Sequence, residues 1–482
     1  MKKTIIGVIM CIFVLMLTGC ISFPTEKGAG SMSTSGEQKP NFVIIMCDDM
    51  GYGDWNRGGN PTIRTPNLNK MADEGVQMTQ FYSGAPVCSP CRSALLTGRN
   101  CIRTGVIKVF FPGNTRGMSQ DETTIAEALK PLGYATACIG KWHLGSKHEY
   151  RPLRQGFDYH YGLLYSNDMY SPDLWRNDKR IEHPTDQSTL TKRYTEEAIA
   201  FIEHFKDRPF FLYLPHTMPH VPLAASEEFR GTSERGLYGD VIEEIDWSTG
   251  QILATLDRLG LSENTLVIFT SDNGPWTIKK QDGGSAGLLR GAKGDTWEGG
   301  MREPFIARWK GRLPAGEVCT EVGSVVDFFP TCIKLAGGII PTDRPIDGID
   351  LMPVVLEGKT SPERAIYYYA AEHLTAIRKG KWKLHFSYYD HSKGGYAIEK
   401  NWVTPKKSLL FDLEVDPSER FNLAGDYPDV VRELIEVAEQ YKEEIRRNGE
   451  NEDLIEWFIK DWKGEILSGK IREITQGKKY QS

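Results

Sequence analysis

The chain lacks the features that would assign it to a membrane, nucleic-acid or zinc-binding class. Its early apolar run, Ile5 to Leu17, is too short to span a bilayer stably. Basic residues do not exceed acidic ones (58 against 64, net charge −6). This balance argues against nucleic acid as a partner, because general nucleic-acid binding depends on a basic surface. No zinc-site spacing of cysteine and histidine occurs. With 40% hydrophobic and 25% charged residues over 482 positions, the sequence indicates a globular protein of about two domains.

The first 39 residues predict an exported and tethered protein. Lys2 and Lys3 precede the apolar run, which is typical of an export signal and not of the fold. Leu17-Thr18-Gly19-Cys20 resembles a bacterial lipoprotein cleavage site, which implies lipidation of Cys20. The alternative is an ordinary signal peptide that happens to contain a cysteine. We therefore expect a signal peptide over 1–20, a flexible Gly- and Ser-rich tether over 21–39, and a lipid anchor in the bacterial cell envelope, at the outer membrane or in the periplasm.

The stretch from Pro86 to Arg99 is the centre of the sequence. It predicts a short helix with Pro90 at the first position and Gly98 just past the end. Cys88 then lies beside the helix start, where free N–H groups and the helix dipole favour an anion. Alone, Cys88-x-x-Cys91 is typical of a thiol–disulfide pair or of half a metal site.

Oxygen-bearing side chains follow two predicted buried strands. The apolar run Asn41 to Cys47 ends at Asp48-Asp49, and the run Thr265 to Thr270 is followed by Ser271 and Asp272-Asn273. In an open α/β sheet the ligand site lies outside the carboxyl ends of the strands. Two adjacent carboxylates there would repel each other unless a cation lay between them. This pattern favours a hard divalent cation, Ca²⁺ with Mg²⁺ possible, and the alternative is a carboxylate pair that only caps a turn.

Two further strand ends carry groups that hold charge or move protons. Lys141 and His143 follow a strand predicted over 134–139. His216 and His220 follow another, predicted over 209–214. A lysine supplies a fixed positive charge and a histidine carries a proton near neutral pH.

Cys88-x-Pro90-x-Arg92, followed by the run Leu95 to Arg99, resembles the signature of the type I sulfatase family. The resemblance covers about residues 40 to 425, with four motifs in the expected order. It implies that a formylglycine-generating maturase oxidises Cys88 to formylglycine, the catalytic nucleophile. The run Gly283 to Pro304 resembles the arylsulfatase A and N-acetylgalactosamine-6-sulfatase group.

The resemblance also implies a role for each site residue. One hydroxyl of the hydrated aldehyde attacks sulfur, and the second later drives out sulfate. The cation is held by the modified residue 88 and by Asp48, Asp49, Asp272 and Asn273. Asp272 takes the proton of the attacking hydroxyl, His220 protonates the leaving oxygen, and His143 deprotonates the second hydroxyl. The sulfate and diol oxygens are held by Lys141, Lys293 and Arg92, with Ser166 as a further sulfate contact and His216 as a neighbour.

The expected fold is an α/β sandwich of the alkaline phosphatase type. A large mixed, mainly parallel sheet flanked by helices occupies 40–358, and an antiparallel sheet with one packed helix occupies 359–482. Further strands are predicted over 76–82, 305–309, 365–370, 375–378, 382–388 and 409–413. Helices are predicted over 65–75, 122–132, 191–206, 237–259, 323–336 and 428–447. The segment from Asp416 to Arg420 is predicted as a turn.

The expected function is hydrolysis of sulfuric esters of sulfated carbohydrate, exo-acting on galactose or N-acetylgalactosamine sulfate. One alternative is a phosphate or phosphonate monoester hydrolase of the same superfamily. Another is a surface lipoprotein that binds sulfated glycans without catalysis. Cys91 stands where many relatives carry serine or alanine, so a disulfide to Cys88 would compete with oxidation. We predict that this disulfide does not form, and we predict no other specific bridge.

Overall fold

The structure, a computed structural model, describes residues 38–169, 171–389, 402–449 and 451–456. The predicted signal peptide, Cys20 and residues 21–37 of the predicted tether lie outside these residues. Within the described part of the chain, every helix is too short or too polar to cross a bilayer.

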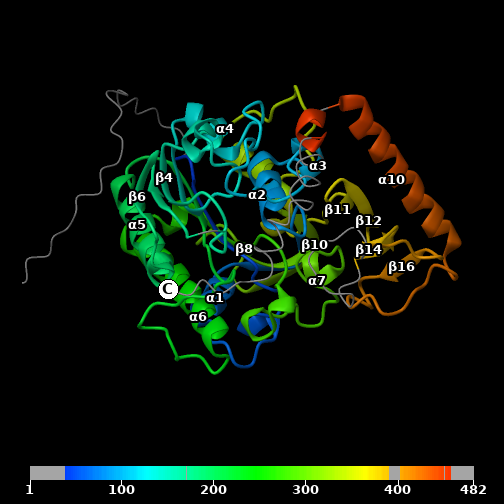
Figure 1. Cartoon of the computed structure of the whole chain (residues 1–482), viewed down its shortest axis with the longest axis horizontal. Helices are drawn as coiled ribbons and strands as arrows, with labels where there is room; N and C mark the ends of the chain where they lie inside the picture. The colour runs from blue at the N-terminus through cyan, green and yellow to red at the C-terminus, as the bar shows by residue number, and fades with distance from the viewer. Residues whose placement is uncertain (1–37, 170, 390–401, 450, 457–482) are drawn as a thin grey trace, which may run out of the picture.

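A ten-stranded mixed sheet forms the centre of the molecule (Figure 1). Strand β1 pairs in parallel with both β7 and β8, and β3 pairs in parallel with β7 and β4. Strand β9 runs antiparallel between β8 and β2. The mainly parallel sheet predicted from the sequence is therefore confirmed. The strands, in order across the sheet, are β10 (Glu317–Ser324), β2 (Val76–Tyr82), β9 (Arg302–Arg308), β8 (Thr265–Ser271), β1 (Asn41–Cys47), β7 (Phe210–Pro215), β3 (Ala135–Lys141), β4 (Tyr159–Leu163), β5 (Leu174–Arg176) and β6 (Lys179–Glu182).

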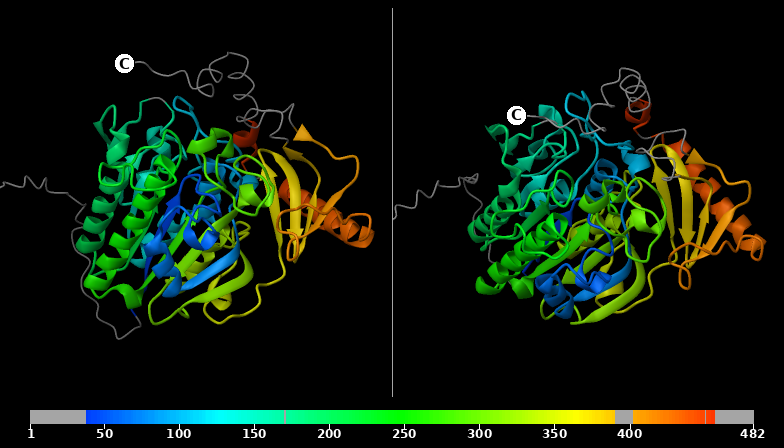
Figure 2. Two further views of the ribbon diagram at one scale, coloured as in Figure 1. Left: turned by 90° about the horizontal axis from the view of Figure 1, so that it is seen from below. Right: turned by 60° about the horizontal axis from the view of Figure 1, so that its bottom comes forward.

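Helices cover both faces of this sheet, so the central strands β1, β3, β7 and β8 are buried along their whole length and mainly apolar. One core joins the sheet to α1 (Pro66–Asp73), α5 (Leu190–His204) and α6 (Leu237–Arg258). The other core joins it to α2 (Cys88–Thr97) and α8 (Phe328–Leu335). Figure 2 shows these layers from two further sides. The shorter helices are α3 (Cys101–Thr104), α4 (Ile125–Leu129), α7 (Glu298–Met301) and α9 (Met352–Val355).

Some elements differ from the sequence-based expectation. Helix α2 begins at Cys88, so Pro90 is its third residue and not its first. The predicted helix 323–336 is a strand end and a 3-10 turn followed by α8. The predicted helix 122–132 is reduced to α4 and a 3-10 turn. Strand β10 was not predicted because it lies at the sheet edge and is largely exposed, and so lacks a continuous apolar run.

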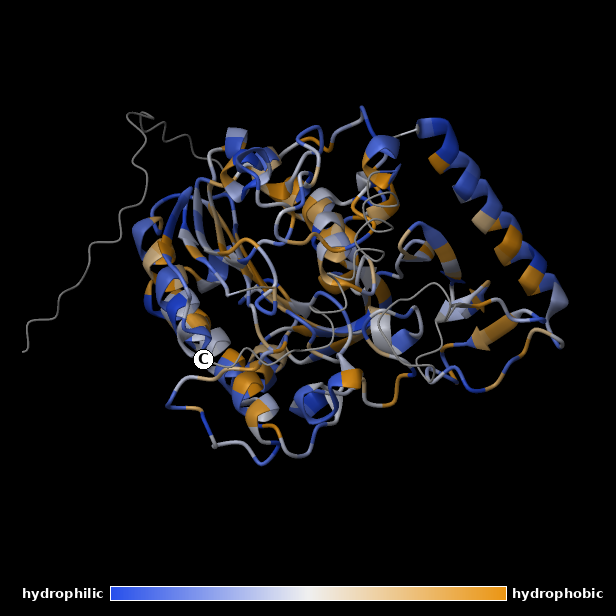
Figure 3. Cartoon of the chain, in the orientation of Figure 1, coloured by the Kyte–Doolittle hydropathy of each residue, from blue (hydrophilic) through white to orange (hydrophobic). Residues whose placement is uncertain are grey.

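The C-terminal domain is a four-stranded antiparallel sheet with one long helix, as predicted. Helix α10 is amphipathic, and hydrophobic residues alternate with hydrophilic ones along it (Figure 3). Its buried residues, Leu434 and Ala438 among them, pack on this sheet. The elements are β11 (Ala365–Ala370), β12 (His373–Lys379), β13 (Trp382–His385), β16 (Leu409–Asp412) and α10 (Pro428–Asn448), with β14 (Tyr388–Tyr389) and β15 (Trp402–Val403) as a separate pair.

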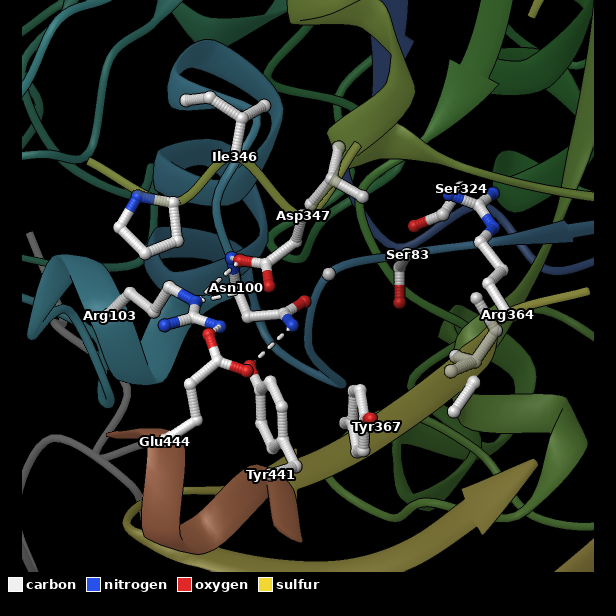
Figure 4. Close-up of a pocket in the computed structure, with 15 residues that line it drawn as sticks. Ser83, Asn100, Arg103, Ser324, Ile346, Asp347, Arg364, Tyr367, Tyr441 and Glu444 are labelled. Atoms are coloured by element: carbon white, nitrogen blue, oxygen red, sulfur yellow. Dashed lines mark hydrogen bonds and ion pairs between the residues drawn. The ribbon is translucent and has the colours of Figure 1, made fainter. Parts of the chain in front are cut away.

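Polar contacts join α10 to the segment that follows α2. The amide of Asn100 donates to the hydroxyl of Tyr441 at 2.6 Å, and Arg103 pairs with Glu444 at 2.6 Å. The ring of Tyr441 also stacks on Tyr367 of β11, with centroids 3.6 Å apart. These residues line a polar pocket of about 290 Å³ at the domain junction (Figure 4).

A second junction is a fully buried charge network around Glu298 of α7. The carboxylate of Glu298 accepts from Tyr82 at 2.6 Å and from Tyr368 at 3.1 Å, and it pairs with Lys383 of β13 at 2.9 Å. Burial alone would raise the pKa of Glu298, but the ammonium of Lys383 outweighs it and the pKa falls to about 2. The carboxylate therefore stays charged inside the protein and joins the two domains.

Substitution of Lys383 by methionine is expected to lower the free energy of unfolding by about 3–5 kcal/mol at pH 7, because it removes the ammonium that pairs with both buried carboxylates, Glu298 and Glu419. The folded pKa of Glu298 is below its ordinary value of 4.5. Its stabilising contribution is therefore present above pH 4.5 and is lost as the pH falls toward 2. The difference between wild type and variant should shrink as the pH falls below 4.5, as measured by urea denaturation.

The matched control is Arg446→Ala, which removes an exposed ion pair with Glu443 on α10 of the same domain. This change should cost about 0–1 kcal/mol. An equal loss in both variants would contradict the buried network as the source of stability.

Candidate active site

The predicted site residues, His216 apart, meet at the carboxyl edge of the central sheet. Asp48 and Asp49 follow β1, and Asp272 and Asn273 follow the adjacent β8. Lys141 is the last residue of β3. The remaining predicted groups come from five other places: Cys88 and Arg92 from α2, His143 from the loop after β3, Ser166 from the segment after β4, His216 and His220 from the loop after β7, and Lys293 from the loop before α7.

Cys88 is the first residue of α2 and is 2% exposed. Its Sγ lies 3.4 Å from Oδ1 of Asp48. Burial raises the pKa of the thiol well above its ordinary value, although the charges of Lys141 and Lys293 act to lower it. An unmodified Cys88 is therefore a neutral thiol and a poor nucleophile.

All seven cysteines within the described residues are free thiols, including Cys88 and Cys91. Burial also raises the pKa of Cys91. That the two stay unpaired in the active enzyme stays a prediction.

Each carboxylate of the first pair is matched to a lysine. The ammonium of Lys293 lies 2.7 Å from Oδ1 of Asp49, and Lys141 contacts Asp48. Burial would raise the pKa of Asp48, but the Lys141 charge dominates and holds it below the ordinary range. The amide of Asn273 donates to Oδ1 of Asp49 at 2.8 Å. The cluster therefore consists of carboxylates and ammonium groups in contact with one another, all of them buried.

Asp272 is held by Arg92 in a forked contact. The Nε and Nη2 groups of Arg92 donate to Oδ2 of Asp272 at 3.0 and 2.7 Å. The backbone N–H of Asp49 donates to the other oxygen at 3.2 Å. Burial, with the negative charge of Asp48, raises the pKa of Asp272 to about 7. Asp272 can therefore both accept and hold a proton near neutral pH.

Two histidines present nitrogen atoms to this cluster. Nε2 of His143 lies 2.9 Å from the carbonyl of Phe110, and its Nδ1 is buried without a hydrogen-bond partner among the described residues. Nδ1 of His220 lies 2.6 Å from the carbonyl of Val221, and its Nε2 lies 3.6 Å from Asp49. Burial lowers the pKa of both rings, with Lys141 adding to the effect at His143 and Lys293 at His220.

The backbone is strained at two of these positions. Asp49 has φ 72° and His143 has φ 59°, in the left-handed region that glycine adopts more easily. Such conformations persist only where the surroundings determine them, and they gather at functional sites.

Ser166 connects the cluster to a neighbouring pocket. Its hydroxyl lies 3.2 Å from Lys141 and 3.4 Å from Nε2 of His220. The pocket has a volume of about 280 Å³ and is lined by apolar groups such as Leu164 and by Asp173 and His183, whose Oδ1 and Nδ1 atoms lie 2.6 Å apart. A mixed apolar and polar cavity of this kind suits a small organic ligand.

The donor set fits a hard divalent cation. Ligand atoms of Asp48, Asp49, Cys88 and His220 lie within 4.8 Å of one another. Oδ1 of Asn273 is buried without a hydrogen-bond partner among the described residues, as an oxygen kept for a cation would be.

His216 is separate from this arrangement. Its Nε2 lies 3.3 Å from the hydroxyl of Ser248, and its ring packs beside Tyr194.

Trp276 was not predicted from the sequence, and its ring lies 5.2 Å from His220 and 4.4 Å from the ammonium of Lys293. It follows Asn273 by three positions, but nothing in the sequence distinguishes it from a structural tryptophan.

This fold and site define an alkaline-phosphatase-like hydrolase. The sequence pattern described as Sulfatase matches residues 40–339, and that described as the C-terminal region of aryl-sulfatase matches residues 361–464. The chain therefore belongs to the sulfatase family and is a sulfuric ester hydrolase.

Individual relatives are similar to this chain over most of their length. The chain is 38% identical over 468 residues to the N-acetylgalactosamine-6-sulfatase of Canis lupus familiaris, covering 87% of this chain and 89% of that protein. It is 37% identical over 454 residues to arylsulfatase G of Rattus norvegicus, covering 82% and 85%. The structure of the PsFucS1 sulfatase from Pseudoalteromonas sp. aligns with a TM-score of 0.78 at 29% identity, covering 85% and 91%.

Proposed function

We propose that the enzyme removes sulfate from a sulfated carbohydrate, using a formylglycine made from Cys88 and a bound divalent cation. The observation that carries this proposal is the convergence of Asp48, Asp49, Lys141 and Lys293 around the Cys88 side chain. A buried thiol with a raised pKa is a poor nucleophile, which favours chemical conversion of residue 88.

The cation is proposed to be Ca²⁺, with Mg²⁺ possible, held by Asp48, Asp49, Asp272, Asn273 and residue 88. When bound, it would lower the pKa of a neighbouring hydroxyl and neutralise the carboxylates. Asn273 supports this assignment through its unpartnered buried Oδ1.

The surrounding side chains would bind the sulfate and move protons. Lys141, Lys293 and Ser166 would bind its oxygens, and Arg92 would hold Asp272 in place to accept a proton. His220 would give a proton to the leaving oxygen from Nε2, because its Nδ1 faces the carbonyl of Val221. The unpartnered Nδ1 of His143 is suited to accept a proton from a hydroxyl at residue 88.

The proposed substrate is a terminal galactose or N-acetylgalactosamine sulfate. The resemblance of residues 283–304 to the N-acetylgalactosamine-6-sulfatase group supports this series, as does the relative of that name. The pocket beside Ser166 would receive the sugar, because it opens directly beside the proposed sulfate-binding groups.

Sulfate release from defined sulfated mono- and disaccharides tests this substrate assignment. We expect turnover of 6-O-sulfated N-acetylgalactosamine or galactose at a chain end, and little from glucosamine or fucose sulfates. Aryl phosphate serves as a parallel substrate, and a preference for phosphate over sulfate would overturn the proposal. Binding of sulfated sugars without release, by protein that carries formylglycine and calcium, would indicate a non-catalytic glycan-binding role.

We further propose that the mature chain begins at a lipidated Cys20 and is anchored at the bacterial cell envelope. The motif Leu17-Thr18-Gly19-Cys20 after a short apolar run supports this assignment. Mass spectrometry of the mature amino terminus tests it, and a chain that begins at an unmodified residue would contradict it.

A further inference from the structure

The loop that carries Lys293 packs against the C-terminal domain. It comprises residues 283–297, between the 3-10 helix η7 (Thr277–Asp282) and α7. On one side, the backbone of Lys293 donates to the carbonyl of Pro275 at 3.0 Å, and Gly294 donates to the carbonyl of Pro86 at 2.9 Å. On the other side, the loop and the start of α7 contact residues of the C-terminal sheet.

Glu419 is the centre of this second contact. Its Oε2 accepts the backbone N–H of Glu298, the first residue of α7, at 2.7 Å. Its Oε1 lies 2.7 Å from Nε2 of His385 and 3.0 Å from the ammonium of Lys383. All four side chains are fully buried. The carboxylate of Glu419 therefore caps the start of α7 directly after the Lys293 loop.

The backbone of Glu419 takes part as well. It has φ 52°, a conformation that glycine adopts more easily. Its carbonyl accepts from Arg290 at 3.0 Å, and the hydroxyl of Ser418 donates to the carbonyl of Leu288 at 2.6 Å. The turn predicted over 416–420 thus forms hydrogen bonds to the loop at Leu288 and Arg290 and to α7 at Glu298.

Aromatic and hydroxyl contacts close the remainder of the interface. The ring of Trp297 lies 4.1 Å from that of His385 in β13, and within the loop the guanidinium of Arg290 lies 3.7 Å from the centre of the Trp297 ring. The hydroxyl of Thr375 donates to that of Thr296 at 2.7 Å. Contacts therefore recur along the loop at residues 288, 290, 296 and 297.

We propose that Glu419 is a positioning residue that holds Lys293 in the active site, so that the C-terminal domain completes the catalytic site of the first domain. This inference rests on the proposed function, which assigns the sulfate to Lys293. A displacement of about 1 Å in a binding group can cost on the order of 10²-fold in rate. Loss of Glu419 would act through such a displacement, since Glu419 does not contact the reacting atoms.

A double-mutant cycle between Glu419→Ala and Lys293→Ala tests this proposal, with kcat/KM for an aryl sulfate as the measured value. We expect Glu419→Ala to lower kcat/KM by about 10- to 100-fold and Lys293→Ala by about 10²- to 10³-fold. In the Lys293→Ala background, Glu419→Ala should add less than about threefold, because the group it positions is absent. Glu419→Gln should recover part of the loss, because its amide oxygen still accepts the N–H of Glu298 although its amide nitrogen cannot accept from Lys383.

The matched control is Arg364→Gln, at another part of the domain junction. Arg364 pairs with the buried Asp327 and lines the pocket of Figure 4, whose lining does not include the Lys293 loop. The Arg364→Gln variant should have a lower unfolding temperature than wild type. Its kcat/KM should stay within about twofold of wild type at a temperature where all variants are folded. If Glu419→Ala does not fold, the same cycle is run with Glu419→Gln, which should show a smaller loss that also disappears in the Lys293→Ala background.

Full activity of Glu419→Ala would overturn the inference. So would a double variant whose loss in kcat/KM equals the product of the losses in the two single variants. Full activity of Lys293→Ala would instead overturn the proposed sulfate-binding role of Lys293. The two failures are thus distinguishable in one set of four proteins.

Discussion

Replacement of Cys88 by alanine is expected to lower sulfate release by about 10⁴-fold or more, as removal of a catalytic nucleophile does in other hydrolases. The Cys88 side chain is buried in the polar cluster, with its sulfur 3.4 Å from Oδ1 of Asp48. Alanine fits the space without steric conflict, so the effect should fall on kcat and not on folding. The measurement is aryl sulfate turnover by protein produced together with a formylglycine-generating maturase.

Cys91 provides a control three positions along the same helix. It is equally buried and unpaired, but it packs in the hydrophobic core and not in the polar cluster. Cys91→Ala should retain activity within about threefold of wild type, with a stability loss typical of a small core truncation. Comparable losses at the two positions would contradict a special role for Cys88.

Removal of the divalent cation is expected to lower turnover by at least about 10²-fold, because carboxylates would then face the sulfate without an intervening positive charge. Dialysis against a chelator followed by assay measures this loss, and added Ca²⁺ should restore activity more fully than Mg²⁺. A second readout is thermal denaturation, since a cation that binds only the folded state raises the unfolding temperature.

Asn273→Leu should weaken this response to Ca²⁺. The change removes the unpartnered Oδ1 and the amide contact to Asp49 while keeping similar volume. The variant should need a higher Ca²⁺ concentration for the same rise in unfolding temperature. A chelated wild-type enzyme with full activity and an unchanged unfolding temperature would show that no such cation takes part.

The sequence predicted the parts of the fold that are buried on both faces. Strands such as β1 and β8 are continuous apolar runs, and this pattern depends only on local sequence and burial. Strand β10 has a mixed pattern because it pairs on one side only. Strands β4 to β6 are short, and β6 is mostly exposed, so their sequences resemble loops.

The residues of the site differ in how far the sequence alone could predict them. Asp48-Asp49 and Asp272-Asn273 follow from elementary electrostatics at the ends of buried strands. Lys293 came only through the family resemblance, because a lysine in a glycine-rich loop carries no signal of its own. Glu419 was predicted as part of a turn, and its contact with Glu298 joins residues 121 positions apart. Long-range contacts of this kind depend on how the two domains pack.

The most direct test of the account is peptide mass mapping of residue 88 alongside specific activity, across preparations made with different amounts of maturase. The account predicts that activity rises in proportion to the fraction of Cys88 converted to formylglycine and extrapolates to zero for the thiol form. Full activity in protein that retains an intact Cys88 thiol, or that carries a Cys88–Cys91 disulfide, would contradict it.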